Sequence, residues 1–211
     1  MNRGATRSEP GVLAASDFRR FVELNAALSE VAPDPRRRSA LASIVDAAEA
    51  LLPGGPRDLL RGLPRAVGEA MAPFGWLWNG FYYARGEREL HVGPAWGPPV
   101  CALLERGGGA LSSGMCFDGL DLNQTLAAYD VKAWPGYVSC DSSSGLSTVS
   151  GIVAPVRDPG GRPIAVWDLD ANQRIEPGDV RFADVLFGTL ARCLPFRPDD
   201  FAESGPQGAN E

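Results

Sequence analysis

The sequence lacks any apolar run of the length that crosses a bilayer. Its longest apolar stretches are interrupted by Arg, Asp or Pro well before the roughly 20 residues that a spanning helix needs. The N-terminal stretch MNRGATRSEPG has no apolar segment of the kind that a secretory signal requires. We therefore expect a protein that does not contact membranes and that works in the cytoplasm.

Concentrated positive charge is also scarce. The formal net charge is -6 and the sequence pI is about 4.9, and the basic residues are scattered apart from the triplet Arg36 to Arg38. Proteins that bind phosphate backbones gather Lys and Arg on one face. Because this chain does not, we expect no nucleic-acid partner.

The chain also has little histidine and no closely paired cysteines. The chain has one histidine, His91, and four cysteines, none of them in a C-x-x-C motif. A zinc site would need widely separated ligands, and four cysteines in a cytoplasmic chain of this size are not typical of a disulfide framework. The pattern favours a reactive or redox thiol, with no metal and no organic cofactor. A buried, inert cysteine remains the alternative for each.

The chain is nevertheless long enough to bury a sizeable core. It has 211 residues, of which 45% are hydrophobic and 22% charged, values that are ordinary for a globular domain. Residues 1–13 are polar and are predicted to be disordered. We expect a helical extension over 14–72, one domain over 73–196 and a polar tail over 197–211.

Apolar periodicity gives most of the predicted elements. Helical spacing runs over 16–31, 41–52, 58–71 and 178–193, and strand-like patterns cover 76–84, 89–92, 100–104, 126–131, 149–156 and 163–169. A short helix is also expected over 118–125. Together they predict an α+β fold, a mainly antiparallel central sheet flanked by helices with an N-terminal helical extension. The N-terminal helices either cover that sheet or form the contact of a homodimer.

The stretch from Trp134 to Asp170 carries the residues with the most chemistry. Cys140 lies between the turn Trp134-Pro135-Gly136 and the polar loop of residues 141–147, so it is predicted to be a pocket residue. Asp168 and Asp170 are two positions apart on a strand and point to the same side. Two such carboxylates suit a substrate ammonium or a shared proton. The alternative is a solvated strand end.

Several short segments together resemble a known family. In order along the chain they are Trp78 to Tyr82, Val92 to Pro94, Cys101, Cys116, Val131 to Asp141, Ile152 to Val156 and Val166 to Asp170. The region from about Phe74 to Leu190 thereby resembles a GAF domain, and specifically the free methionine-(R)-sulfoxide reductases. The resemblance covers a little over half of the chain and leaves the N-terminal helices unexplained.

The resemblance implies a pocket for free methionine sulfoxide. Trp78 and Tyr82 would lie against the sulfoxide end, and Asp168 and Asp170 would be among the polar ligands. It also implies thiol-based reduction through a sulfenic acid and a disulfide, recycled by a thioredoxin-like reductant. Cys140 would attack, with Cys116 as a competitor for that role, and Cys101 or Cys116 would be the resolving thiol.

This chain departs from the family pattern at one binding position. Where the family has an acidic residue after a serine, the chain has Ser150-Gly151. Asp141, Asp118 or Asp121 could supply the missing charge, and a glutamate at position 151 is expected to improve turnover. The rival interpretation is a non-catalytic GAF-type small-molecule-binding or redox-sensing module. A purely structural interaction domain is a third reading, with no motif in its favour.

Overall fold

The computed structural model describes residues 13–107, 114–137, 139–140, 145 and 147–202. The α-helices are α1 Phe18–Ala26, α2 Leu28–Val31, α3 Pro35–Leu51, α4 Gly55–Met71, α5 Met115–Leu122, α7 Pro177–Cys193 and α8 Pro198–Phe201. The strands are β1 Trp76–Arg85, β2 Glu89–Trp96, β3 Leu103–Glu105, β4 Leu126–Ala128, β5 Ser150–Arg157 and β6 Pro163–Ala171. None of the described helices is long and apolar enough to cross a membrane.

The strands form one antiparallel sheet in the order β3-β2-β1-β6-β5-β4. The hairpin between β5 and β6 turns at Asp158, whose carboxylate accepts hydrogen bonds from the backbone N–H groups of Gly160 and Arg162. Such side-chain acceptors close tight turns without help from the rest of the fold. The predicted α+β class and antiparallel sheet are confirmed.

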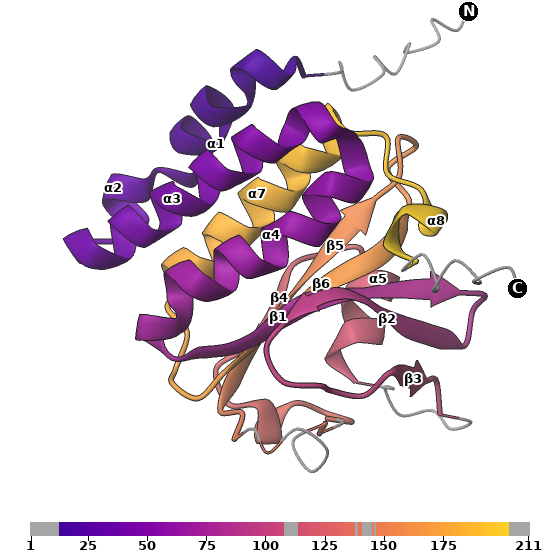
Figure 1. The fold of residues 1–211 in the computed structure, drawn as a ribbon. Coiled ribbons are helices and arrows are strands. Elements are labelled where there is room, and N and C mark those ends of the chain that lie inside the picture. Colours follow the sequence, from indigo (N-terminus) through magenta and orange to yellow (C-terminus); the bar gives the residue numbers. More distant parts are fainter. Residues whose placement is uncertain (1–12, 108–113, 138, 141–144, 146, 203–211) are drawn as a thin grey trace, which may run out of the picture.

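Helices cover one face of this sheet. Figure 1 shows α4 and α7 against this face, with α1, α2 and α3 outside them, and α5 on the opposite face. The apolar side chains of these helices and of the covered face form one cluster. Phe182, Leu186 and Leu190 of α7 are buried in that cluster, as predicted from their spacing, and Val185 packs at its edge. Of the N-terminal helices, α4 covers the sheet, and α1, α2 and α3 pack on α4 and α7.

Several element boundaries differ from the predicted ones. The first helix is interrupted at Ala27, which takes a left-handed conformation with φ 49. The third strand begins at Leu103, so Cys101 lies in the loop before it; two prolines, Pro98 and Pro99, remove the ladder donors there. Helix α5 starts at Met115 and therefore includes Cys116, earlier than the short helix predicted from residue 118.

The polar tail predicted from residue 197 begins with an ordered element. Helix α8 occupies Pro198–Phe201, and the Phe201 side chain has no exposed surface. Its ring packs against Phe81 and Tyr83 of β1. A single aromatic in a polar segment is a weak sequence signal, but burying it removes a large apolar area from water.

A buried ion pair joins the N-terminal helices to α7. The Arg37 guanidinium donates to both carboxylate oxygens of Asp179, a residue with 0% exposed surface. The same arginine stacks on Phe74 and contacts Glu176. Because both charges are withdrawn from water, each depends on the other for compensation.

We expect Arg37→Met to lower the free energy of unfolding by about 3–5 kcal/mol, because it leaves a buried carboxylate without its cation. Urea denaturation followed by circular dichroism measures the change. The matched control is Arg57→Met, which breaks an exposed pair with Asp200 and should cost less than about 1 kcal/mol. Equal losses in the two variants would contradict this account of the ion pair.

Candidate functional site

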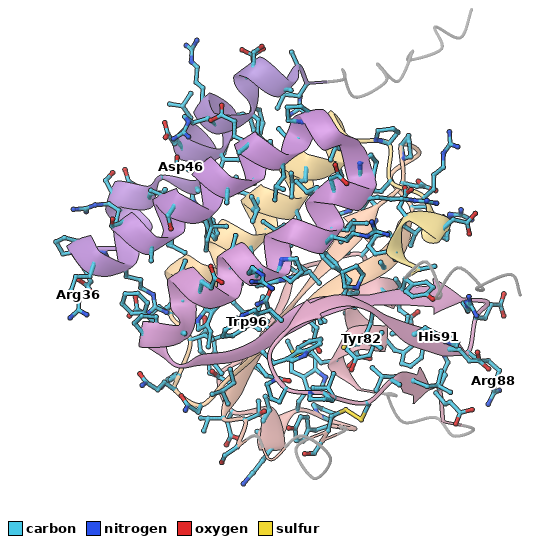
Figure 2. The ribbon with its side chains drawn as sticks, viewed as in Figure 1. Arg36, Asp46, Tyr82, Arg88, His91 and Trp96 are labelled. Atoms are coloured by element: carbon cyan, nitrogen blue, oxygen red, sulfur yellow. A yellow bond between two sulfur atoms is a disulfide. The ribbon has the colours of Figure 1, made fainter. Side chains whose placement is uncertain are left out.

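The face of the sheet opposite α4 and α7 carries a pocket. The described residues that line it come from β1, the loop and strand of β3, α5, the segment before Cys140, β5 and β6: Tyr82, Val100, Leu104, Gly114, Met115, Cys116, Val131, Trp134, Tyr137, Cys140, Gly151, Asp168 and Asp170. Figure 2 shows Tyr82 on this side of the sheet, away from α3 and α4. Apolar walls with a few convergent polar groups are typical of small-molecule sites.

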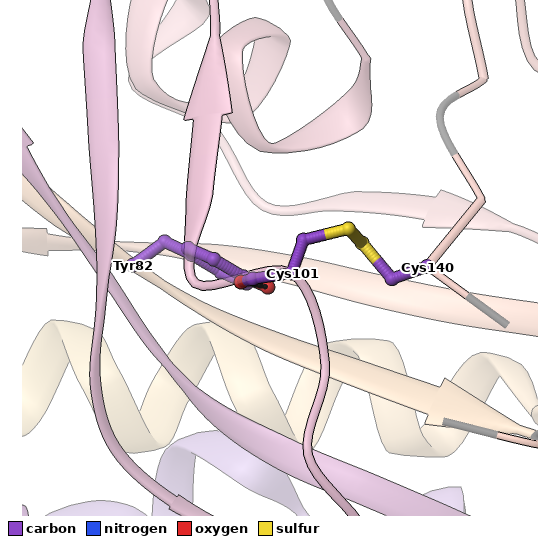
Figure 3. The surroundings of a disulfide bond; sticks show 3 residues. All are labelled: Tyr82, Cys101 and Cys140. Carbon is purple, nitrogen blue, oxygen red and sulfur yellow. Dashed lines mark hydrogen bonds between the residues drawn. A yellow bond between two sulfur atoms is a disulfide. The ribbon is translucent and has the colours of Figure 1, made fainter. Parts of the chain in front are cut away.

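Two of the predicted thiols form a disulfide at this pocket. Cys101 and Cys140 are bonded, with their Cα atoms 5.5 Å apart. The Tyr82 hydroxyl donates a hydrogen bond of 2.8 Å to the carbonyl oxygen of Cys101 (Figure 3). Burial raises the pKa of Tyr82, and Asp168 adds to the effect, so the phenol keeps its proton and remains a donor. Tyr82 thus fixes the backbone that presents Cys101 to Cys140.

The third predicted thiol is separate from that bond. Cys116 is a free, buried cysteine on α5, and its thiol hydrogen-bonds to the Asp168 carboxylate. Burial raises the pKa of Cys116 well above its usual value, and the charge of Asp168 raises it further. A thiol in this setting is a poor nucleophile at neutral pH because it stays protonated.

Asp168 is a carboxyl group of the pocket whose pKa is strongly raised. Burial raises its pKa to about 6, although the hydrogen bonds from Cys116 and from the backbone of Leu169 act in the opposite direction. A carboxylic acid with this pKa exchanges a proton readily near neutral pH, as a general acid must. Asp170 lines the same pocket, so the predicted pairing of these two side chains on one side of β6 is observed.

Gly151 lies beside Asp170 in the β5–β6 register and lines the pocket. A Cβ atom built there would be 2.8 Å from the carbonyl oxygen of Leu169 and 3.9 Å from the Asp170 carboxylate. Contacts under about 3 Å to backbone require a shift of the strands. The expected gain from a glutamate at position 151 is therefore opposed by strain, and we no longer expect it from a single substitution.

The remaining predicted ligands lie differently. Trp78 is 1% exposed and packs with Tyr82, their ring centroids 5.8 Å apart, inside the apolar cluster beneath the pocket. It is not among the described lining residues, so a ligand contact for Trp78 stays a prediction. Asp141 lies outside the described residues. Cys193 is on α7 against the helix-side core, on the other face of the sheet.

Sequence reasoning missed the two aromatic walls of the pocket. Trp134 and Tyr137 line it, whereas the sequence indicated only a turn at Trp134-Pro135-Gly136. Large aromatics in a polar loop next to a candidate nucleophile are the signal that could have found them. Among the described residues, no group of three His, Cys, Asp or Glu side chains is arranged to hold a metal ion.

Two relatives of known sequence match a little over half of the chain. GAF domain-containing protein A of Dictyostelium discoideum is 29% identical over 119 residues, which span 56% of this chain and 69% of that protein. Protein YtsP of Bacillus subtilis (strain 168) is 31% identical over 120 residues, which span 56% of this chain and 68% of that protein. No sequence model of a known family matches the chain.

Solved structures match the fold. A putative GAF sensor protein from Burkholderia vietnamiensis superposes with a TM-score of 0.62 at 25% identity, over 75% of this chain and 95% of that one. Free methionine-R-sulfoxide reductase from Neisseria meningitidis, solved in complex with its substrate, gives a TM-score of 0.57 at 25% identity, over 79% and 88% of the two chains. The chain belongs to the GAF domain family, and its structural neighbours include the free methionine-R-sulfoxide reductases.

The raised pKa of Asp168 predicts a pH-dependent cost to stability. Because the folded chain holds this proton more tightly than the unfolded chain, the stability it confers is present at low pH and is lost as pH rises through about 6. We expect Asp168→Asn to raise the free energy of unfolding by about 1–2 kcal/mol at pH 8 and to leave it nearly unchanged at pH 4.

Urea denaturation at a series of pH values measures this difference. Asp184→Asn is the control, because Asp184 is an exposed carboxylate on α7 whose loss should change stability by less than about 0.5 kcal/mol. If Asp168→Asn destabilises the chain at pH 8, the buried carboxylate is compensated better than this account allows.

Proposed function

We propose that this protein reduces free methionine-(R)-sulfoxide to methionine, with Cys140 as the attacking thiolate and Cys101 as the resolving thiol. The observation that carries the proposal is the Cys101–Cys140 disulfide beside a pocket that also presents Asp168 and Asp170. A disulfide at a ligand pocket is what a completed reduction leaves behind. The likeness to a reductase solved with its substrate supports the same reaction.

The chemistry balances without any metal. The Cys140 thiolate attacks the sulfoxide sulfur, the oxygen takes up one proton and passes to Cys140 as a sulfenic acid, and methionine leaves with its sulfur reduced. The Cys101 thiol then attacks the sulfenic sulfur and water is released. The products are methionine, water and the Cys101–Cys140 disulfide. A thioredoxin-like dithiol donor reduces this disulfide and is itself oxidised.

Asp168 is the group suited to deliver the proton. Its pKa of about 6 leaves a fraction of the side chain protonated at neutral pH, and it lines the same pocket as Cys140. Asp170, two positions along β6, would balance the substrate ammonium. The apolar walls formed by Val100, Leu104 and Met115 suit the aliphatic chain of the substrate.

In this scheme Cys116 is not the resolving thiol, although the sequence left that role open for it. Its thiol is buried and hydrogen-bonded to Asp168, whereas Cys101 is already bonded to Cys140. We assign Cys116 to positioning the Asp168 carboxyl. A dithiol donor works in a reducing compartment, so the proposal includes the expected cytoplasmic location.

A second function is favoured by Gly151. The family's acidic residue is missing there, so a substrate loses one polar partner, and an unpartnered charge in a pocket costs several kcal/mol. Under this alternative the domain binds a small molecule and its disulfide senses redox state, without turnover. Measured binding of the free sulfoxide with no methionine formed would favour it.

The reductase proposal predicts steady production of methionine from the R epimer and not from the S epimer, with thioredoxin and thioredoxin reductase as the electron source. Cys140→Ser should lower the rate at least about 100-fold, because the attacking atom is lost. Cys193→Ser is the control and should retain the wild-type rate, since Cys193 lies on α7 across the sheet. Chromatographic quantification of methionine provides the measurement.

Cys101→Ser separates the two half-reactions. In the absence of small thiols, the reduced variant should form about one methionine per chain and then stop, because its sulfenic acid has no partner. If wild type forms no methionine from either epimer, the reductase proposal fails. If Cys140→Ser retains activity, the assignment of the nucleophile fails.

A further inference from the structure

The segment that carries Cys140 is tied to α5 by a hydrogen bond that the reaction scheme does not use. The indole Nε1 of Trp134 donates to the carboxylate of Asp118 across 2.8 Å, and both side chains are half-buried. Asp118 lies two residues after Cys116 on α5. A hydrogen bond to a carboxylate is about twice as strong as one between neutral groups, so this contact is a firm attachment.

Trp134 is well placed to pass this attachment on to Cys140. Its backbone N–H bonds to the carbonyl of Val131, and the N–H of Tyr137 bonds in turn to the Trp134 carbonyl, each across 3.1 Å. Gly136 completes the turn with φ 70, a conformation that suits glycine. Fixing the indole therefore fixes the turn from which the chain runs to Cys140.

The attachment matters when the disulfide is open. Trp134 and Cys140 line the same pocket, so a turn held against α5 keeps the segment that carries Cys140 at that pocket. Holding that segment in place raises the effective concentration of one thiol at the other.

We propose that Asp118 and Trp134 are positioning residues that hold Cys140 within reach of Cys101 and of the pocket in the reduced protein. This inference deepens the proposed function, and its consequence for turnover rests on that function. Its first consequence, the ease of closing the disulfide, is independent of any substrate. A merely structural contact would change stability without changing that closure.

The test is a glutathione redox titration of the purified full chain. Two glutathione molecules leave as one glutathione disulfide is consumed and the Cys101–Cys140 bond forms, so the equilibrium constant reports the effective concentration of the pair. Samples are quenched with acid and alkylated, and the Cys101–Cys140 peptide is quantified by mass spectrometry. The use of one specific peptide excludes contributions from Cys116 and Cys193.

Trp134→Phe keeps the ring and removes the N–H, and Asp118→Leu keeps the approximate shape and removes the acceptor. Each should lower the equilibrium constant about tenfold, and the double variant should fall no further than either single one, because both remove the same bond. Asp118→Asn, which keeps an acceptor oxygen, should stay within about threefold of wild type.

Trp76→Phe is the matched control. The Trp76 Nε1 is buried and has no partner among the described residues, and its ring packs on the helix side of the sheet. Removing that N–H should leave the equilibrium constant unchanged. The inference is overturned if Trp134→Phe and Asp118→Leu both stay within twofold of wild type, or if Trp76→Phe falls as far as they do.

The outcomes also separate this inference from the proposed function. A tenfold fall in both variants, with no methionine formed by wild type, supports the positioning pair and removes the reductase proposal. Turnover of the R epimer by wild type, with unchanged equilibrium constants in the variants, supports the reductase and removes the positioning pair. With both intact, Trp134→Phe and Asp118→Leu should slow the first turnover while Asp118→Asn restores it.

Discussion

The two-residue alternation of β6 is the constraint on which the site depends. Trp167, Leu169 and Ala171 face the helix layer, where each is at most 2% exposed. The positions between them, Asp168 and Asp170, must then face the other side, where they line the pocket beside α5. The apolar residues that bind the helices thereby dictate where the carboxylates point, and a register slip of one residue would bury both charges in the core.

The neighbouring strands use the same alternation. On β5, Val153 faces the apolar cluster beneath the pocket, while its neighbours Ile152 and Ala154 face the helices. On β1 a register shift between Gly80 and Tyr82 accompanies the placement of Phe81 on the helix side and Tyr82 at the pocket. The pocket is therefore built partly from strand residues, which hold their side chains more rigidly than loops do, and partly from α5 and the loops that carry Val100 and Cys140.

Rigidity at this site has a thermodynamic cost. Because the pKa of Asp168 is raised, its ionised form lowers the free energy of unfolding. A pocket that keeps a carboxylic acid with a pKa near neutral is therefore less stable than one without it. The helix layer compensates, with an extensive apolar cluster and the Arg37–Asp179 pair. Stability and chemistry are thus assigned to opposite faces of one sheet.

Local patterns in the sequence predicted much of this arrangement. The β5–β6 hairpin, the apolar stripe of α7 and the shared side of Asp168 and Asp170 each follow from residues close together in the chain. The Arg37–Asp179 pair and the Trp134–Asp118 bond do not, because they join residues 142 and 16 positions apart and leave no periodic signal.

Pairing among the thiols shows the same limit. The sequence left Cys101 and Cys116 as equal candidates for the resolving role, because spacing does not determine which side chains meet. Helix α5 starts at Met115 and places Cys116 in the buried cluster with Phe117, where it is a free cysteine. Cys101 lies in the loop before β3, where Pro98 and Pro99 cannot donate backbone hydrogen bonds to a sheet, and it is bonded to Cys140.

The central claim is that Cys101 and Cys140 form a working redox couple at a ligand pocket. It is tested most directly by counting thiols in the reduced, reductant-free protein before and after one equivalent of free methionine-(R)-sulfoxide. The account predicts a fall from four thiols per chain to two, with the lost pair mapped to Cys101 and Cys140. Four thiols remaining, or a disulfide that includes Cys116 or Cys193, would contradict it.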